Sequence, residues 1–371
     1  MSDPAEKNPI IRYSDLAQEK APANGDVRNG GVAARPAEIA FRAIDGLKPS
    51  GGAESPLIRA QTVMPDSQSG DLFRQATREM HVVYEGVRQG HTLRIEPLFA
   101  LAEIIAAHPA PDQLIRQIFE DQKQAPTAPH RNAATCGIIA AQVARGLGYQ
   151  KDDLVQLTVA ALLHDIGVEQ LPLSLLEKPG KLSDEEFKMV QTHPELGYRI
   201  LHKDAPGHPL VAQIVRQEHE RETGQGYPNK LDASAILEPA KVIGVTDIYD
   251  ALITPRPYRK AFCPHEAIQE LIECQERMGY ARHVVRALVQ QLSLFPTGCL
   301  VRLSSNEVGR VIQTNNRSPL RPVVEVLYAD QVPLAVPRIV DLNENPLLHI
   351  VTSLCPSDHP ANIPDGAQGS A

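Results

Sequence analysis

The sequence predicts a mainly α-helical protein with a small β-rich segment towards its C-terminus. From about residue 71 to residue 294, apolar side chains recur at helical spacing, and glycine and proline separate the segments. After Phe295 the pattern changes to short runs rich in β-branched residues, with Asn, Gly and Pro between them. A chain of 371 residues is long enough to bury a sizeable core in such a bundle.

The N-terminal part divides into two regions. Residues 1–70 are rich in Pro, Gly, Ser, Ala and Asp, and we expect a disordered extension because they hold too little apolar surface to offset the entropy lost on ordering. Residues 71–124 are expected to form a helical region, since DLFRQATREMHVVYEGVRQG and IEPLFALAEIIAAHP each carry an apolar stripe. The main bundle is expected over residues 125–294.

Helix signals mark the elements of this bundle. AATCGIIAAQVARGLGY and DDLVQLTVAALLHDIG are a predicted helix pair, with Gly148 ending the first helix and Asp152 or Asp153 capping the second. In KLSDEEFKMVQTHPELGYRIL, Ser183 and Glu186 have the spacing of a capping box. Further helices are predicted in HPLVAQIVRQEHE, EPAKVIGVTDIYDALIT and PHEAIQELIECQERM.

The C-terminal part is expected to be a β appendage followed by a tail. Residues 295–345 contain CLVRLS, VGRVIQT, PVVEVLYA and PRIVDL, which are typical of short strands. Residues 346–371 end in DHPANIPDGAQGSA and are expected to be largely disordered.

Composition excludes some classes of function. A formal net charge of −8 argues against binding DNA or RNA, which usually requires a basic face to neutralise phosphates. The chain has no uninterrupted apolar run of about 18 residues that would span a membrane. Its polar start, MSDPAEKNP, does not resemble a signal peptide, so we expect a cytoplasmic protein.

Polar residues inside apolar helical segments are the first functional signal. His164 and Asp165 end the apolar run VAALLHDIG, where burial penalises both unless they have partners. Alone, this pair is best interpreted as a satisfied core histidine and a helix-capping aspartate. His193, His219 and Asp247 stand on or beside other apolar helical segments, and chance scatter is the alternative explanation. Four such sites favour a metal centre built from facing helices with imidazole and carboxylate ligands.

Two further motifs could contact a phosphorylated ligand. In TPRPYRKAF, Arg256 and Arg259 are three residues apart, and arginine forks match phosphate oxygens; a solvated basic turn is the alternative. Tyr227 follows Gly226 in RQEHERETGQGYP, where it could stack on a base or pack against the bundle. For Tyr227 taken alone, packing is favoured.

Roughly residues 125–300 resemble the bacterial HD-GYP domains of the HD superfamily. LLHDIG, KPGKLSDEEFKMVQTHPELGYRIL, EHERETGQGYP and TDIYDALITPRPYRKAF stand in family order and at family-like spacing. The resemblance implies an HD-type helical bundle and a metal-dependent phosphodiesterase that hydrolyses cyclic di-GMP in bacterial second-messenger signalling. At the positions that match the family's motifs, the resemblance implies that the metal ligands are His164, Asp165, His193, His219 and Asp247. It also implies that His164 and Asp165 are catalytic and that Tyr227, Arg256 and Arg259 contact the substrate.

The resemblance also implies cofactors and partners. Two divalent metal ions, iron, manganese or zinc, would share Asp165 and activate water for in-line attack on phosphorus, giving linear pGpG or GMP. Cyclic di-GMP is the implied ligand. A homodimer is implied by family habit, and a protein signalling partner is a further candidate.

This sequence departs from the family pattern at three places. Val168 replaces the lysine that usually follows HDIG, so a cation that would face the phosphate is missing. Glu218 replaces the first histidine of a His-His pair, and a glutamate can still bind a hard cation. Asn132 stands where a family histidine begins a helix, and His130 is two residues away. Since two residues turn a helix by about 200°, either the helix start shifts so that His130 is a ligand or one metal ion loses a ligand.

Two functions follow from these departures. The first is a phosphodiesterase with weakened or altered activity, holding two metal ions or only one. The second is a catalytically inactive HD-GYP module that binds cyclic di-GMP or a partner protein without turnover.

Overall fold

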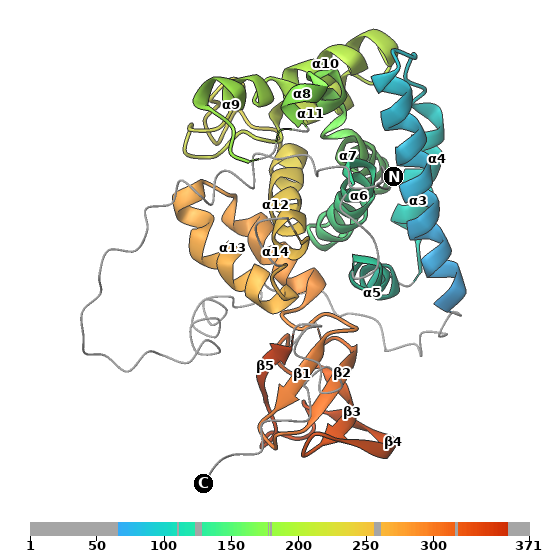
Figure 1. Cartoon of the computed structure of the whole chain (residues 1–371), viewed down its shortest axis with the longest axis vertical. Coiled ribbons are helices and arrows are strands. Elements are labelled where there is room, and N and C mark those ends of the chain that lie inside the picture. Colours follow the sequence, from blue (N-terminus) through green and yellow to red (C-terminus); the bar gives the residue numbers. More distant parts are fainter. Residues whose placement is uncertain are drawn as a thin grey trace, which may run out of the picture.

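The computed structural model describes residues 66–109, 111–122, 128–176, 178, 180–255, 261–315 and 318–354. The expected disorder of residues 1–65 and 355–371 lies outside the described residues, as do Arg256 and Arg259. The predicted fold class is confirmed: helices form a bundle, and an antiparallel sheet follows near the C-terminus (Figure 1). Among the described residues, no helix combines the length and the apolarity that a bilayer span needs.

The N-terminal helices are α3 (Asp66–Arg88), α4 (Glu96–Ala107) and α5 (Pro111–Gln122). Residues 66–70, which we assigned to the disordered extension, form the start of α3, so that boundary is corrected. The polar stretch DSQSG lacks apolar residues but suits a helix start, where Asp and Ser are favoured, and the apolar stripe of the helix begins only at Leu72. Helix α3 packs along α6, α5 and the short η1 helix.

Two helices form the centre of the bundle. Helix α6 (Pro129–Gly146) is buried continuously from Asn132 to Ala144, and α7 (Lys151–Leu163) is buried over most of its length. Gly148 follows α6 with a φ of +83°, the left-handed conformation predicted for a helix end. The N-cap of α7 is Gln150, so the predicted aspartate cap is wrong. Both aspartates lie in the first turn, where their negative charge interacts favourably with the helix dipole.

The remaining helices surround this pair. They are η1 (Ile166–Gln170), α8 (Leu173–Leu176), α9 (Asp184–Val190), α10 (His193–Asp204), α11 (Pro209–Gln217), α12 (Glu238–Ile253), α13 (Pro264–Met278) and α14 (Arg282–Leu292). The capping box at the start of α9 is confirmed, because Ser183 N donates to Glu186 Oε2 over 2.6 Å and Glu186 N donates to Ser183 Oγ over 3.2 Å. Helix α12 packs against α6, α11, α13 and α14.

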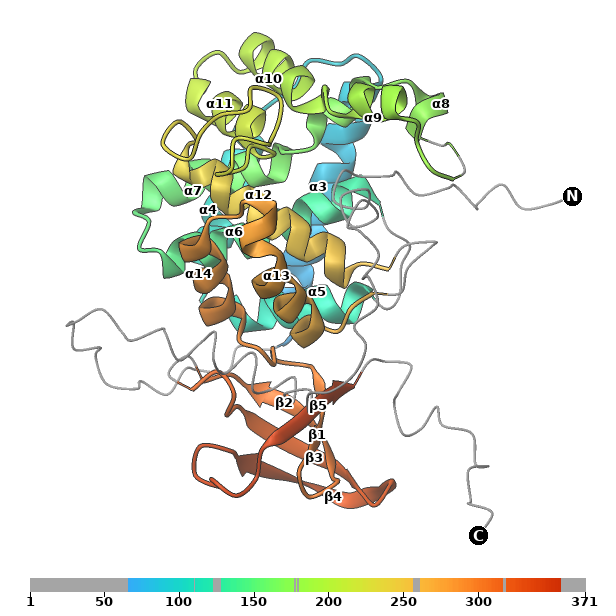
Figure 2. The same cartoon turned by 90° about the vertical axis from the view of Figure 1, so that its left-hand side faces the viewer.

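Five antiparallel strands complete the described chain in the order β4-β3-β2-β1-β5. They are β1 (Leu300–Leu303), β2 (Val308–Gln313), β3 (Val323–Ala329), β4 (Val332–Asp341) and β5 (Ile350–Leu354). Strand β5 falls within the predicted disordered tail, which corrects that boundary; the edge of β1 gains backbone hydrogen bonds from β5 that it would otherwise lack. Figure 2 shows the sheet below α13 and α14, away from α10 and α11.

Candidate metal centre

The His164–Asp165 pair lies in the turn between α7 and η1. Both side chains are buried, and Asp165 directly precedes η1. Gly167 allows η1 to lie against the start of α10, because a Cβ there would come within 2.0 Å of the carbonyl oxygen of His193. This close approach of two backbones brings the turn next to His193.

Backbone carbonyls orient two of the histidines. Nδ1 of His164 donates to the carbonyl oxygen of Ala161 over 2.8 Å, and Nδ1 of His193 donates to that of Val190 over 2.8 Å. In both rings Nδ1 is therefore hydrogen-bonded to the carbonyl oxygen three residues earlier in the chain, and Nε2 is the nitrogen that faces the other cluster residues. Metal-binding histidines in proteins are commonly held in this way by a hydrogen bond to the other ring nitrogen.

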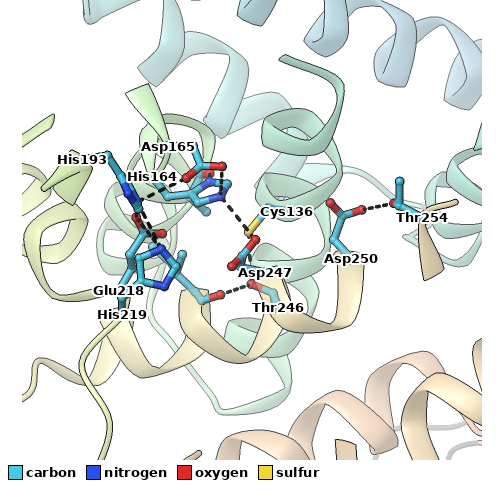
Figure 3. A network of polar contacts seen from close by, with 12 residues as sticks. Cys136, His164, Asp165, His193, Glu218, His219, Thr246, Asp247, Asp250 and Thr254 are labelled. Atoms are coloured by element: carbon cyan, nitrogen blue, oxygen red, sulfur yellow. Dashed lines mark hydrogen bonds and ion pairs between the residues drawn. The ribbon is translucent and has the colours of Figure 1, made fainter. Parts of the chain in front are cut away.

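The side chains of Asp165, His193, Glu218 and His219 meet in the centre of the bundle. Each offers one ligand atom, and these atoms all lie within 4.8 Å of one another. Nε2 of His193 is 3.4 Å from Asp165 Oδ1, 3.4 Å from Glu218 Oε1 and 3.1 Å from His219 Nε2. Glu218 and His219 follow α11, so three separate chain segments supply the cluster (Figure 3).

His164 and Asp247 extend this cluster on one side. Nε2 of His164 lies 3.4 Å from Asp165 Oδ2 and 3.7 Å from Asp247 Oδ1, which is on α12. The two carboxylate oxygens of Asp165 thus face two different imidazoles, those of His193 and His164. The five residues that the sequence predicted from polar positions in apolar segments are brought together, and Glu218 joins them (Figure 3).

Helix packing places Asp247 beside this cluster. Its neighbour Thr246 lies with Oγ1 3.3 Å from Sγ of the buried Cys136, which links α12 to α6. Thr246 also donates to the carbonyl oxygen of Ile243 within its own helix. The contact between Thr246 and Cys136 therefore helps to fix α12 against α6, and Asp247, the next residue of α12, lies beside the cluster.

Glu218 is the least satisfied group in the cluster. Its side chain is fully buried, and among the described residues neither carboxylate oxygen has a hydrogen-bond partner. Burial raises the pKa of Glu218, while the nearby His164 and His193 act in the opposite direction. A buried carboxylate without donors is costly, whereas a cation among these oxygen and imidazole donors would satisfy it. The residues present therefore fit a divalent metal ion.

The histidines of the cluster have opposite pKa shifts. Burial opposes the charge on His164, but the carboxylates of Asp165 and Glu218 outweigh it and raise the pKa well above 6.5. Burial likewise opposes the charge on His193, whose pKa is raised by Glu218 and Asp165. Burial, together with the adjacent His193, lowers the pKa of His219 well below 6.5. These opposite pKa shifts favour His193 as the donor in its 3.1 Å contact with Nε2 of His219.

The loop after His219 folds back on its own start. A Cβ on Gly226 would come within 2.5 Å of the backbone nitrogen of Arg221, so only glycine fits this crossing. Tyr227 N donates to the carbonyl oxygen of His219 over 3.2 Å, and its ring stacks on that of His219 with centroids 4.7 Å apart. Tyr227 is buried, which agrees with the packing interpretation.

Two residues that sequence analysis missed hold this loop. The buried carboxylate of Glu220 accepts hydrogen bonds from Asn229 N over 2.6 Å and Leu231 N over 2.9 Å. The guanidinium of Arg221 donates to the carbonyl oxygens of Glu218 and Glu220 over 3.0 and 2.8 Å. The string EHER, which contains His219, was the available signal, but a string of charged residues does not reveal that its partners are backbone groups.

The three departures from the family pattern occupy different surroundings. His130 is not one of the four clustered residues; its ring lies edge-on to His81 of α3, with centroids 4.7 Å apart. Burial, with a smaller contribution from His81, lowers the pKa of His130 to about 4. Asn132 is buried, and its Nδ2 has no hydrogen-bond partner among the described residues. Val168 is buried in a small apolar cluster with Leu171.

Two families and several known proteins are similar to this chain. The HD domain family matches residues 113–284, and a family described as a KOW domain associated with HD domain matches residues 300–362, which include most of the predicted β segment and part of the predicted tail. The cyclic di-GMP phosphodiesterase PA4108 of Pseudomonas aeruginosa is 36% identical over 212 residues, covering 57% of this chain and 50% of the relative.

Two other relatives are similar over shorter stretches. The cyclic di-GMP phosphodiesterase response regulator RpfG of Xanthomonas campestris is 36% identical over 141 residues, covering 38% of this chain and 37% of the relative. The 3′3′-cGAMP-specific phosphodiesterase 3 of Vibrio cholerae is 35% identical over 154 residues, covering 42% of this chain and 33% of the relative. The chain thus spans half or less of the length of these relatives.

Proposed function

Because residues 113–284 belong to the HD domain family and carry the motifs of its HD-GYP branch, we propose that the protein is a metal-dependent phosphodiesterase that hydrolyses cyclic di-GMP to pGpG or GMP. The observation that carries this proposal is the buried convergence of Asp165, His193, Glu218 and His219. Two of the relatives described above are named as cyclic di-GMP phosphodiesterases.

The metal ligands in this proposal are the clustered residues. Asp165, His193, Glu218, His219, His164 and Asp247 would hold the metal. A bound divalent ion would polarise a phosphoryl oxygen and lower the pKa of a bound water. The two oxygens of Asp165 face His193 and His164 separately, which supports a bridging role and favours two ions of iron, manganese or zinc over one.

The chain's own groups would orient the substrate and restrict water. Tyr227, stacked on His219, closes one side of the centre, and Glu220 fixes the loop that carries it. We propose that Arg256 and Arg259, which lie outside the described residues, contact the phosphates. Val168 supplies an apolar surface where the family pattern has a cation, so the proposed activity is weakened or altered.

A second function is favoured by specific observations. Asn132 is buried with an Nδ2 that lacks a partner among the described residues, and Val168 cannot neutralise a phosphate. An inactive module that binds cyclic di-GMP or a partner protein is therefore the alternative. A homodimer, a protein partner and a cytoplasmic location stay predictions.

Product release and metal content separate these functions. Purified protein would be loaded with manganese, iron or zinc and incubated with cyclic di-GMP and, in parallel, with 3′3′-cGAMP; linear products are measured beside a His164→Ala, Asp165→Ala double variant. We expect at least one ion per chain, and pGpG or GMP release from cyclic di-GMP above the double variant. Metal with no product, together with cyclic di-GMP binding, would establish the inactive module. Faster hydrolysis of 3′3′-cGAMP would contradict the proposed substrate.

A further inference from the structure

The last turn of α3 is joined to the segment that follows Asp165. Nε of Arg88 donates to Oε2 of Glu169 over 2.6 Å. The Glu169 side chain is fully buried, whereas the Arg88 side chain is 37% exposed. Among the described residues, the second oxygen of Glu169, Oε1, has no hydrogen-bond partner. Arg88 therefore supplies the charged donor to a carboxylate that water does not reach, and loss of one member of such a pair is costly.

Two weaker contacts support the same arrangement on both sides of the His164–Asp165 turn. Tyr84 of α3 donates its hydroxyl to the carbonyl oxygen of Leu162 over 3.4 Å, just before the turn. Gln170 of η1 donates to the carbonyl oxygen of Val87 over 3.4 Å, after the turn. Helix α3 therefore contacts both the end of α7 and η1.

The short η1 helix lies between α3 and the metal cluster. On one side it contacts α3 through Glu169, and on the other Gly167 meets the backbone of His193. A 3₁₀ helix has poorer internal hydrogen-bond geometry than an α-helix, so its placement depends more on outside contacts. Movement of η1 would change the 3.4 Å separation between Asp165 Oδ1 and His193 Nε2.

We propose that Arg88, acting through Glu169, is a positioning residue that holds Asp165 in register with His193. Helix α3 thereby sets the geometry of the metal centre from outside the cluster. The consequence for metal affinity rests on the proposed function, but the placement of the turn does not. A change in the position of α3 is then a route by which the metal centre can be regulated.

Amide hydrogen exchange of the metal-free protein tests the placement. The variants are Arg88→Met, Glu169→Gln and their combination, with Arg78→Met as a matched control on the exposed face of α3. We expect the amides of residues 166–170 to exchange about tenfold faster in either single variant than in the parent protein. The double variant should exchange at the same rate as the single variants, and the control at the rate of the parent. Arg88→Lys, which keeps a cation, should restore part of the protection.

Manganese affinity tests the effect on the cluster. Free Mn²⁺ would be followed by electron paramagnetic resonance during titration, and melting curves would confirm that each variant is folded. We expect the dissociation constant to rise about tenfold in Arg88→Met and not in Arg78→Met, as for other residues that orient metal ligands indirectly. Unchanged exchange at residues 166–170, or unchanged affinity in a variant with faster exchange, would overturn the positioning role.

The two proposals fail separately. If the parent protein binds no manganese, iron or zinc, the proposed function fails, while amide exchange alone still decides whether Arg88 places the turn. If the parent protein binds metal and the Arg88 variants match it in both measurements, only the positioning role is lost.

Discussion

Oε1 of Glu218 lies 3.4 Å from Nε2 of His193, with both side chains buried in the centre of the bundle. The resemblance to HD-GYP domains implies a histidine at position 218, where this chain has an anionic side chain in place of a neutral one. Because this carboxylate has no hydrogen-bond donor among the described residues, its charge is compensated only by the nearby imidazoles in the absence of metal. The position therefore couples metal affinity to the protonation of its neighbours.

Glu218→Gln should weaken metal binding. The amide keeps the shape of the side chain but removes the anionic ligand, so the manganese dissociation constant should rise at least about tenfold. Isothermal titration measures this change. Glu103→Gln, the same substitution at an exposed position on α4, is the matched control and should bind as the parent does. Equal affinity in the two variants would exclude Glu218 as a ligand.

Metal removal should lower stability. An ion that binds the folded chain but not the unfolded chain stabilises the fold by about 2.7 kcal/mol at a concentration 100 times its dissociation constant. Thermal melting with excess manganese should therefore occur at a higher temperature than melting with a chelator. The His164→Ala, Asp165→Ala double variant controls for unspecific ion effects. An equal rise in that variant would show that the stabilisation comes from elsewhere.

Metal affinity should increase with pH. In the metal-free protein the pKa values of His164 and His193 lie above 6.5, so both rings stay protonated to higher pH than in the unfolded chain. Their pairing with the carboxylates stabilises the metal-free fold fully below about pH 6.5, and this contribution is lost as pH rises through the raised values. Metal binding needs neutral rings and releases these protons. Titration in buffers of different ionisation enthalpy measures the release; affinity that is independent of pH would contradict these shifts.

The loop that carries Tyr227 should depend on Glu220. Glu220→Ala leaves the backbone nitrogens of Asn229 and Leu231 without their acceptor, and we expect the free energy of unfolding to fall by about 2 to 4 kcal/mol. Urea denaturation measures this loss. Glu222→Ala removes a partly exposed ion pair with Lys241 and should cost about 1 kcal/mol or less. Similar losses in both variants would show that Glu220 is not the anchor of the loop.

The sequence predicted the core of the site better than its supports. His164, His193 and Asp247 could be recognised because each is a polar residue beside an apolar helical run, and facing helices bring such positions together. Glu218 was identified only through the resemblance, since a glutamate beside a histidine is common in polar loops. The pairing of Arg88 with Glu169 could not be predicted, because the two residues are 81 positions apart and each looks like a surface charge.

Element boundaries were less predictable than element types. The helical bundle and the C-terminal strands are confirmed, but polar residues 66–70 begin a helix and β5 lies in the predicted tail. One predicted helical stretch is also divided, since α9 ends at Val190 and α10 begins at His193. This break places His193 at a helix start beside Gly167. Pro194, in the first turn of α10, is the sequence signal for it, because proline disfavours the helical conformation in the residue before it.

Metal content together with product release from cyclic di-GMP tests the central proposal most directly. The full chain, purified with manganese or iron under anaerobic conditions, is expected to hold at least one ion per chain and to release pGpG or GMP. The His164→Ala, Asp165→Ala double variant should lose both properties. Less than one ion per chain, with no product above that variant, would contradict a metal-dependent phosphodiesterase.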